Sequence, residues 1–331
     1  MAKKTVARLS PESCSYADFY EGYLQRNEPC VFTKELTEDW PCGKEWTLPT
    51  GECDLDKLSS LYGECDVPVT DCDSQGGYGE AQTSTEKLRD FLNYMRKPAS
   101  ERTSCRYLKD WHFYRSFPES KVYSVPEYFS SDWLNNYCDG RFDAVNKDYR
   151  FVYFGPAASW TPLHVDVLQS FSWSANVCGR KKWILFRPGE EKKLFAKFGT
   201  NLTDISEVDL SDVEHSVVVQ EAGEVIFVPS SWYHQVHNIG DCLSINHNWI
   251  NAVNVDKVHS FLLTSLENVK KELTGGWNVF ESAEEFEERC QKIMKADCGM
   301  DLAEFADMFN MASQKKLAHQ ESDLLFKYMF L

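Results

Sequence analysis

Residues 161–166 read Thr-Pro-Leu-His-Val-Asp, and residues 223–238 read Gly-Glu-Val-Ile-Phe-Val-Pro-Ser-Ser-Trp-Tyr-His-Gln-Val-His-Asn. In the first stretch, His164 and Asp166 stand two residues apart, and this spacing puts both side chains on one face of an extended segment. Such a pair by itself also fits an ordinary hydrogen-bonded pair at a protein surface. A third ligand is required before the pair predicts a metal site.

The second stretch supplies candidates for that third ligand. An apolar run at 225–228, then Pro229, then a histidine-containing run at 233–238 indicate a strand, a turn and another strand. This arrangement can return a histidine to the first pair. Two histidines and one carboxylate occupy one face of an octahedral Fe(II) and leave three positions open for a chelating cosubstrate and O2. Structural zinc prefers a closed site of four ligands, so the pattern favours iron.

Two histidines of the second stretch compete for the role of third ligand. His234 and His237 lie on opposite faces of an extended strand, so only one of them can point towards His164 and Asp166. A packed or exposed neutral histidine is the ordinary situation in proteins, and it is also the default interpretation of His112 and His247. The residues alone leave the choice between His234 and His237 open.

The sequence around these stretches indicates a β core. From residue 149 to residue 249, short apolar runs alternate with Gly, Pro, Asp and Asn. Three of these runs are residues 151–154, 183–186 and 225–228. Their length and their punctuation are typical of strands in a sandwich or jelly roll.

The sequence on both sides of the β core has a different pattern of apolar residues. Upstream, residues 29–32 read as a short strand, and residues 83–86 resemble a capping box in front of an amphipathic helix. Helical spacing of apolar residues occurs on both sides of the β core, at Phe19, Tyr20, Tyr23 and Leu24, at Leu88, Phe91, Leu92 and Met95, at Leu262, Leu266, Val269 and Leu273, and at Leu302, Phe305 and Phe309.

We therefore expect a single globular unit over residues 1–331. It would consist of a mixed helical and strand flank at 1–147, a β core at 148–250 and a C-terminal helical region at 251–331. With 43% hydrophobic residues, the chain has enough apolar surface for a substantial core.

Composition limits the classes of partner and the compartment. The 51 acidic and 35 basic residues give a net charge of −16, which repels a phosphate backbone and argues against direct nucleic-acid binding. The charge serves either solubility or attraction of a basic protein substrate. Residues 1–8 lead into polar sequence and no apolar run has membrane-spanning length, so we expect no secretory signal and no membrane partner. Twelve scattered cysteines without a Cys-x-x-Cys pair predict reduced thiols in cytoplasm or nucleus.

Three motifs in order resemble the signature of jumonji-C (JmjC) oxygenases. They are residues 161–166, residues 179–186 (Gly-Arg-Lys-Lys-Trp-Ile-Leu-Phe) and residues 228–234 (Val-Pro-Ser-Ser-Trp-Tyr-His). The resemblance is sharp over residues 148–250, and fainter upstream in Tyr-Leu-Lys-Asp-Trp-His-Phe at 107–113 and Pro-Glu-Tyr-Phe at 126–129.

The resemblance implies a fold, a chemistry and a set of site residues. The fold is a double-stranded β-helix, the cupin-like jelly roll, with 148–250 as its catalytic core. The chemistry requires Fe(II), 2-oxoglutarate as cosubstrate and O2. The family pattern selects His234 over His237, so that His164, Asp166 and His234 serve as metal ligands and catalytic residues.

In such enzymes 2-oxoglutarate chelates the iron, and its distal carboxylate is held by a cation and a hydroxyl through charge-assisted hydrogen bonds. The resemblance assigns these roles to Lys181 and Thr161, although residues 180–182 taken alone would read as a solvated turn. Alternation gives two strands a polar face that either lines a pocket or meets solvent, formed by Ser172, Ser174 and Asn176 and by Ser244, Asn246 and Asn248. The family pattern favours cosubstrate-side positions for Ser174 and Asn246.

Residues 171–183 resemble a branch of the family that hydroxylates a lysine of the eukaryotic translation termination (release) factor. This resemblance implies a protein substrate, and it leaves the oligomeric state open. Histone lysine demethylation is an alternative within the same chemistry, weakened because no zinc finger or other chromatin-reading module is visible in the chain. A non-catalytic cupin-like binding module is a further alternative, and the complete set of predicted ligands together with Lys181 argues against it.

Overall fold

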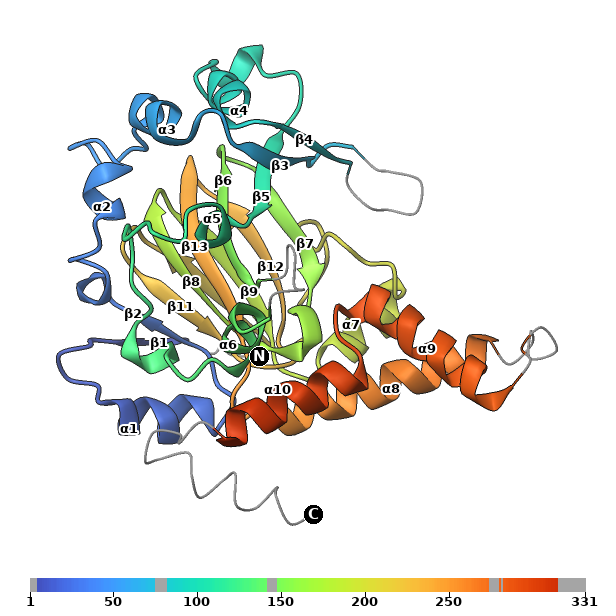
Figure 1. The fold of residues 1–331 in the computed structure, drawn as a ribbon. Coiled ribbons are helices and arrows are strands. Elements are labelled where there is room, and N and C mark those ends of the chain that lie inside the picture. Colours follow the sequence, from blue (N-terminus) through green and yellow to red (C-terminus); the bar gives the residue numbers. More distant parts are fainter. Residues whose placement is uncertain (1–4, 75–81, 142–147, 274–279, 281, 315–331) are drawn as a thin grey trace.

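The computed structural model describes residues 5–74, 82–141, 148–273, 280 and 282–314. Its strands form two sheets with the orders β1-β2-β11-β8-β13-β6-β5-β3-β4 and β10-β9-β12-β7 (Figure 1). Four strands of the large sheet and the four strands of the small sheet come from the predicted β core, and antiparallel pairing connects neighbours within each set. This architecture is the jelly roll that the sequence predicts.

The strands of the jelly roll have the following bounds. In the large sheet they are β6 (Arg150–Gly155), β8 (Phe171–Cys178), β11 (Val225–Val228) and β13 (Cys242–Trp249). In the small sheet they are β7 (Trp160–His164), β9 (Lys181–Phe186), β10 (His215–Gln220) and β12 (Tyr233–Asn238). The strands expected at residues 151–154, 183–186 and 225–228 are therefore confirmed.

The segment before residue 148 extends the large sheet with five more strands. They are β1 (Ala7–Leu9), β2 (Cys30–Phe32), β3 (Asp66–Asp71), β4 (Thr83–Lys87) and β5 (Arg106–Trp111). β2 pairs with β11 on one side of the jelly-roll strands, and β5 pairs with β6 on the other. The division into a flank, a core and a helical region stays a prediction.

The expected capping box at residues 83–86 is wrong. Thr83 and Thr85 lie in β4, which pairs antiparallel with β3, and the hydroxyls of Thr70 and Thr83 are hydrogen-bonded at 2.9 Å. The helix α4 (Leu88–Met95) begins only after Lys87, and no side chain caps it. Threonine favours extended backbone because of its branched Cβ, and the available partner strand decides the local structure here.

The segment before residue 148 also forms short helices. They are α1 (Tyr16–Phe19), η1 (Tyr20–Leu24), η2 (Lys34–Leu36), α2 (Cys42–Glu45), α3 (Leu55–Tyr62), η3 (Ala99–Glu101), α5 (Phe113–Ser116), η4 (Glu127–Phe129) and α6 (Trp133–Asp139). Within the jelly roll lie η5 (Val167–Gln169) and α7 (Glu191–Phe198). The predicted helices at Phe19 and at Leu88 are confirmed.

Three C-terminal helices, drawn in orange and red in Figure 1, lie together beside the sheets. They are α8 (Val255–Leu273), α9 (Ala283–Cys298) and α10 (Leu302–Gln314). Leu262 and Leu266 of α8 and Phe305 of α10 are buried in a cluster that also contains Trp133 of α6. The helical stripes expected in this region are therefore confirmed. Within the described ranges, none of the helices combines the length and the apolarity that crossing a membrane requires.

A layer of aromatic side chains packs against one face of β8 and fixes the register of this strand. Phe171 and Trp173 of β8 are buried there, with Phe129 stacked on Trp173 at a ring-centroid distance of 5.6 Å and Trp249 5.0 Å from Phe171. Because side chains alternate along a strand, the even-numbered Ser172 and Ser174 point to the opposite face. A shift of β8 by one residue would bury the serines in the aromatic layer, so this layer fixes the register.

The turn between β8 and β9 depends on Gly179. Its φ of +74° lies in the left-handed region, and an added Cβ would stand 2.2 Å from the backbone oxygen of Asp241. We expect Gly179→Ala to lower the free energy of unfolding by about 2–4 kcal/mol, measured by urea denaturation. Gly189→Ala is the matched control because Gly189 has φ of +101° but open space around it, so its loss should be only about 1–2 kcal/mol. Equal losses would contradict the close approach at Gly179.

The expectation that all cysteines are reduced is wrong for one pair. Cys53, in the loop before α3, forms a disulfide with Cys178 at the end of β8, and the other ten cysteines are free. The two residues are separated by 125 positions in sequence, so no local spacing could have indicated the pair. The bond connects the upstream segment to the strand that precedes Lys181.

Candidate active site

The structure brings the three predicted metal ligands together. His164 is the last residue of β7, Asp166 follows it by two residues, and His234 lies directly opposite His164 on the paired strand β12. One ligand atom from each side chain falls within 4.8 Å of the others, and the two imidazole centroids are 4.2 Å apart. Among the described residues no other group of three such side chains meets this spacing. The strand pairing therefore creates a site that can hold one ion.

Hydrogen bonds orient each of these side chains and leave one atom available. The Nδ1 atom of His164 lies 2.7 Å from the carbonyl of Pro162, and Nδ1 of His234 lies 3.0 Å from the carbonyl of Trp232. A protonated Nδ1 that donates to a carbonyl leaves the lone pair on Nε2 for a metal. Ser172 donates a 2.7 Å hydrogen bond to Oδ2 of Asp166, so the other carboxylate oxygen remains available. This donor set fits a facial arrangement around Fe(II).

Electrostatics keep His164 in the form that binds metal. Desolvation, and then the adjacent imidazole of His234, lower the pKa of His164 to about 4, although Asp166 acts in the opposite direction. A neutral imidazole has the free lone pair that coordination requires.

His237 lies on the other face of β12 and does not join the three ligands. It stacks on Trp160 at 6.1 Å, and its Nε2 is 2.9 Å from the amide nitrogen of Gln235. The packed histidines expected elsewhere are found at His247, which stacks on Trp173 at 4.1 Å, and at His112, which is bonded to Asp148.

The three ligands open into a pocket between the two sheets. The pocket is small, with a free volume of about 60 Å³. Its lining includes every residue predicted for the iron and cosubstrate site, namely Thr161, His164, Asp166, Ser174, Lys181, His234 and Asn246. The rest of its wall consists of Tyr107, Tyr153, Ser172, Trp173, Trp183, Val236 and Asn248.

Lys181 is buried at the start of β9, with only 2% of its surface exposed. Its Nζ atom donates to the hydroxyl of Ser244 at 2.7 Å and lies 3.5 Å from the hydroxyl of Tyr107. In the part of the chain that the structure describes, no carboxylate forms an ion pair with it, and burial lowers the pKa of Lys181 to about 8. A buried ammonium is costly without a counter-charge, and the distal carboxylate of 2-oxoglutarate would supply one.

Further polar atoms of the pocket are also suited to a ligand. Ser174 and Asn246 are register partners on β8 and β13, and the hydroxyl of Ser174 and Oδ1 of Asn246 are buried without a hydrogen-bond partner among the described residues. Buried polar atoms of this kind indicate a missing partner. With Thr161 in the same wall, the residues present fit both iron and 2-oxoglutarate.

Two aromatic residues of the pocket, Tyr107 and Tyr153, were not expected from the sequence. Tyr107 begins the 107–113 stretch, where only a faint family likeness was visible, and Tyr153 lies within a run read simply as a strand. Their place in the pocket wall depends on the pairing of β5 with β6, which joins segments far apart in sequence. No local signal in the sequence could have indicated it.

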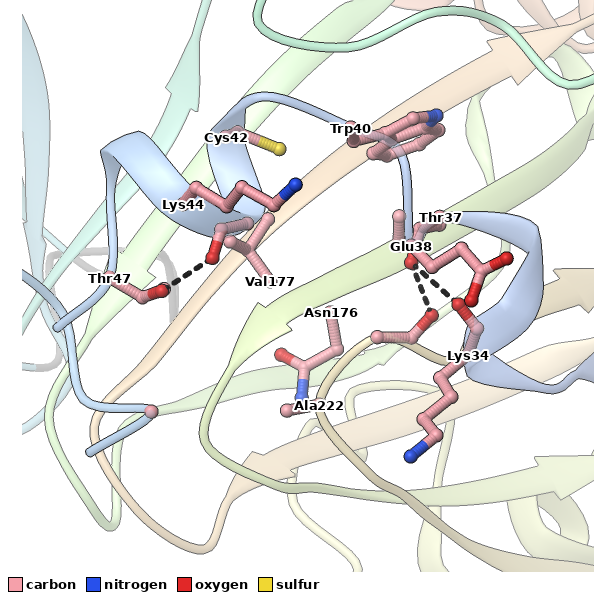
Figure 2. A pocket seen from close by; sticks show the side chains of 14 residues that line it. Lys34, Thr37, Glu38, Trp40, Cys42, Lys44, Thr47, Asn176, Val177 and Ala222 are labelled. Atoms are coloured by element: carbon pink, nitrogen blue, oxygen red, sulfur yellow. Dashed lines mark hydrogen bonds between the residues drawn. The ribbon is translucent and has the colours of Figure 1, made fainter. Parts of the chain in front are cut away.

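A second cavity lies apart from the metal ligands, between η2, α2 and the end of β8 (Figure 2). Lys34, Trp40 and Lys44 line it together with Asn176, which was expected to share a face with Ser172 and Ser174. Asn176 is not part of the iron pocket, because its amide donates to the carbonyl of Gly179 in the following turn. Burial raises the pKa of the Cys42 thiol in this cavity to about 12, so the thiol is not a nucleophile at neutral pH.

Known proteins resemble the chain over nearly its whole length. The family described as cupin-like domain matches residues 16–254. The 2-oxoglutarate and iron-dependent oxygenase JMJD4 of Danio rerio is 41% identical over 322 residues, which cover 93% of this chain and 74% of that protein. The protein of the same name from Homo sapiens is also 41% identical, over 93% of this chain and 75% of its own length. The arginine-specific demethylase JMJ20 of Arabidopsis thaliana is 35% identical, over 91% and 68%.

Proposed function

Because the chain belongs to the cupin-like JmjC family of 2-oxoglutarate and iron-dependent oxygenases, we propose that it hydroxylates a lysine side chain of a protein, the translation termination factor. The observation that carries the proposal is the meeting of His164, Asp166 and His234 with Lys181 in one pocket. It supports an active oxygenase rather than a binding module that has lost the chemistry.

Each residue of the pocket has a separable role in the reaction. His164, Asp166 and His234 would hold one face of the iron, and Lys181 with Thr161 would hold the distal carboxylate of 2-oxoglutarate. Iron and 2-oxoglutarate, when bound, supply one oxygen atom from O2 for oxidation of a C–H bond, with succinate and CO2 as co-products. Ser172 keeps the Asp166 carboxylate oriented through its 2.7 Å hydrogen bond, and aromatic side chains form part of the pocket wall.

Two features support lysine of the termination factor as the target. The segment at residues 171–183 resembles the branch of lysyl hydroxylases that act on this factor, and only this feature points to the particular substrate. The net charge of −16 suits a basic target. The reacting carbon has to approach the iron closely, so the lysine enters the pocket while the rest of the substrate rests on the rim.

Demethylation of a methylated lysine or arginine is the second candidate function. It uses the same chemistry, because hydroxylation of an N-methyl group is followed by loss of formaldehyde. The chain is 35% identical to a protein named as an arginine-specific demethylase, and this identity favours demethylation as a second candidate. Both candidates act on a cationic side chain of a protein.

We expect the protein, incubated with Fe(II), 2-oxoglutarate and O2, to add one oxygen to a side-chain carbon of a termination-factor lysine. Tandem mass spectrometry of the factor and of methylated histone peptides, treated in parallel, measures the product of each. The His234→Ala variant is the control for oxidation that does not depend on the site. Methyl loss from a histone peptide with an unmodified factor would replace the proposal by demethylation. Absence of a visible charge-transfer band in the anaerobic complex with Fe(II) and 2-oxoglutarate would indicate a binding module instead.

A further inference from the structure

A β-bulge interrupts the pairing of β5 with β6 beside the pocket. Leu108 pairs with Phe154 and Trp111 pairs with Val152, so Lys109 and Asp110 together stand opposite the single residue Tyr153. Bulges of this kind redirect side chains and are frequent next to active sites. The bulge therefore places two charged residues opposite a residue of the pocket wall, and one of them, Asp110, contacts it.

The backbone of Asp110 is held in an unusual conformation. Its φ is +60°, in the left-handed region that residues other than glycine rarely adopt. Such a conformation costs about 1–3 kcal/mol and persists where the surrounding structure enforces it, frequently at functional sites. Since the side chain of Asp110 is exposed, burial of that side chain does not account for the conformation.

Asp110 reaches the pocket through Tyr153. The hydroxyl of Tyr153 donates a 2.6 Å hydrogen bond to Oδ1 of Asp110, and the same tyrosine lines the iron pocket. Burial, and then the charge of Asp110, raise the pKa of Tyr153 well above its ordinary value, so the phenol stays protonated and keeps donating. The carboxylate of Asp110 therefore lies at the rim, where the wall formed by Tyr153 meets solvent.

One oxygen of this carboxylate remains available. Oδ1 accepts from Tyr153, whereas no hydrogen bond or ion pair involves Oδ2 within the described residues. Asp166, the other acidic side chain whose charge acts on Tyr153, is a predicted metal ligand and already accepts from Ser172. Asp110 is thus the carboxylate next to Tyr153 that is not engaged by the metal site.

We infer that Asp110 is a specificity-determining residue that binds the cationic end of the substrate side chain. The inference rests on the proposed function, since it requires a basic target residue. A lysine side chain that enters the mouth of the pocket can bring its carbon chain to the iron ligands, pack against the Tyr153 ring and present its ammonium to Asp110 at the rim. Arginine would satisfy the same carboxylate, so the feature recognises positive charge rather than one residue type.

The test is a double-mutant cycle that combines Asp110→Asn in the enzyme with the replacement of lysine by norleucine in the peptide substrate. Asparagine tolerates the left-handed backbone and still accepts from Tyr153, so this variant removes only the charge. We expect kcat/KM for a lysine peptide to fall about ten- to a hundredfold, with an unchanged apparent constant for 2-oxoglutarate. On a peptide with norleucine in place of lysine, the variant and the unmodified enzyme should perform equally. Asp90→Asn, which changes an exposed aspartate on α4, is the matched control and should match the unmodified enzyme on both peptides.

Two further measurements keep this test independent of the proposed function. Asp110→Gly suits the left-handed backbone but removes the whole side chain, so it should stay folded by urea denaturation while binding the lysine peptide as weakly as Asp110→Asn. Equilibrium binding of the lysine and norleucine peptides to anaerobic protein loaded with Mn(II) reports recognition without turnover. Oxidation of methylarginine but not lysine would refute the proposed function, and the same cycle with that substrate would then decide the role of Asp110. Equal losses of Asp110→Asn on charged and uncharged peptides, in turnover or binding, would overturn the inference itself.

Discussion

Replacement of any one of His164, Asp166 and His234 by alanine should lower substrate turnover by on the order of a thousandfold or more. Each change removes one of the three ligands that share a face of the ion, so both metal retention and the geometry of the open positions are lost. The measurements are bound iron, determined by elemental analysis after anaerobic loading and desalting, and the rate of succinate formation. All three variants should lose both.

His237→Ala is the control for this prediction. His237 lies on the same strand as His234, but it stacks on Trp160 on the opposite face and contacts none of the three ligands. Its replacement should leave most of the activity and all of the bound iron. Loss of iron from the His237 variant, with retention in the His234 variant, would show that the ligand assignment is wrong.

The second large effect concerns the cosubstrate. Lys181→Ala should raise the apparent constant for 2-oxoglutarate by about ten- to a hundredfold, because a hydrogen bond to a charged group contributes about 1.5–3 kcal/mol. Iron binding should change much less, since the coordination shell is left intact. Turnover at varied 2-oxoglutarate concentrations and bound iron measure the two effects separately.

Lys182→Ala provides the comparison. Lys182 is the adjacent residue of β9 and is exposed, whereas Lys181 is buried in the pocket. The Lys182 variant should therefore have the cosubstrate dependence of the unmodified protein. A large defect in the Lys182 variant, with none in the Lys181 variant, would mean that the inward-facing phase of β9 has been misassigned by one residue.

The features that could be predicted from sequence are those determined by local periodicity. His164 and Asp166 share a face because side chains alternate along an extended segment, and the strand-turn-strand pattern around Pro229 brings His234 back to them. The short apolar runs of the β core and the apolar stripes of α8 and α10 follow from the same kind of local rule. The roles of these residues in binding iron and cosubstrate remain predictions, although the structure places all of them in one pocket.

The features that could not be predicted depend on contacts between distant segments. The strand at Thr83 requires β3 as a partner, and its local sequence favoured a helix cap instead. The disulfide between Cys53 and Cys178 has no spacing signal. Tyr153 and Asp110 meet only because β5 bulges against β6. In each case the deciding free energy comes from pairing that a window of neighbouring residues does not contain.

The alternation along β8 divides the strand into two sets of positions that can vary separately. Its odd-numbered side chains, such as Phe171, belong to the aromatic layer, whereas Ser172 and Ser174 line the pocket. Substitutions in the polar set would thus change contacts inside the pocket and leave the aromatic layer in place. The aromatic set carries the opposite constraint, since a cavity behind Trp173 would move the backbone that carries Ser172 and, through it, Asp166. Substitutions on one face of this single strand can therefore change the catalytic preference of the fold.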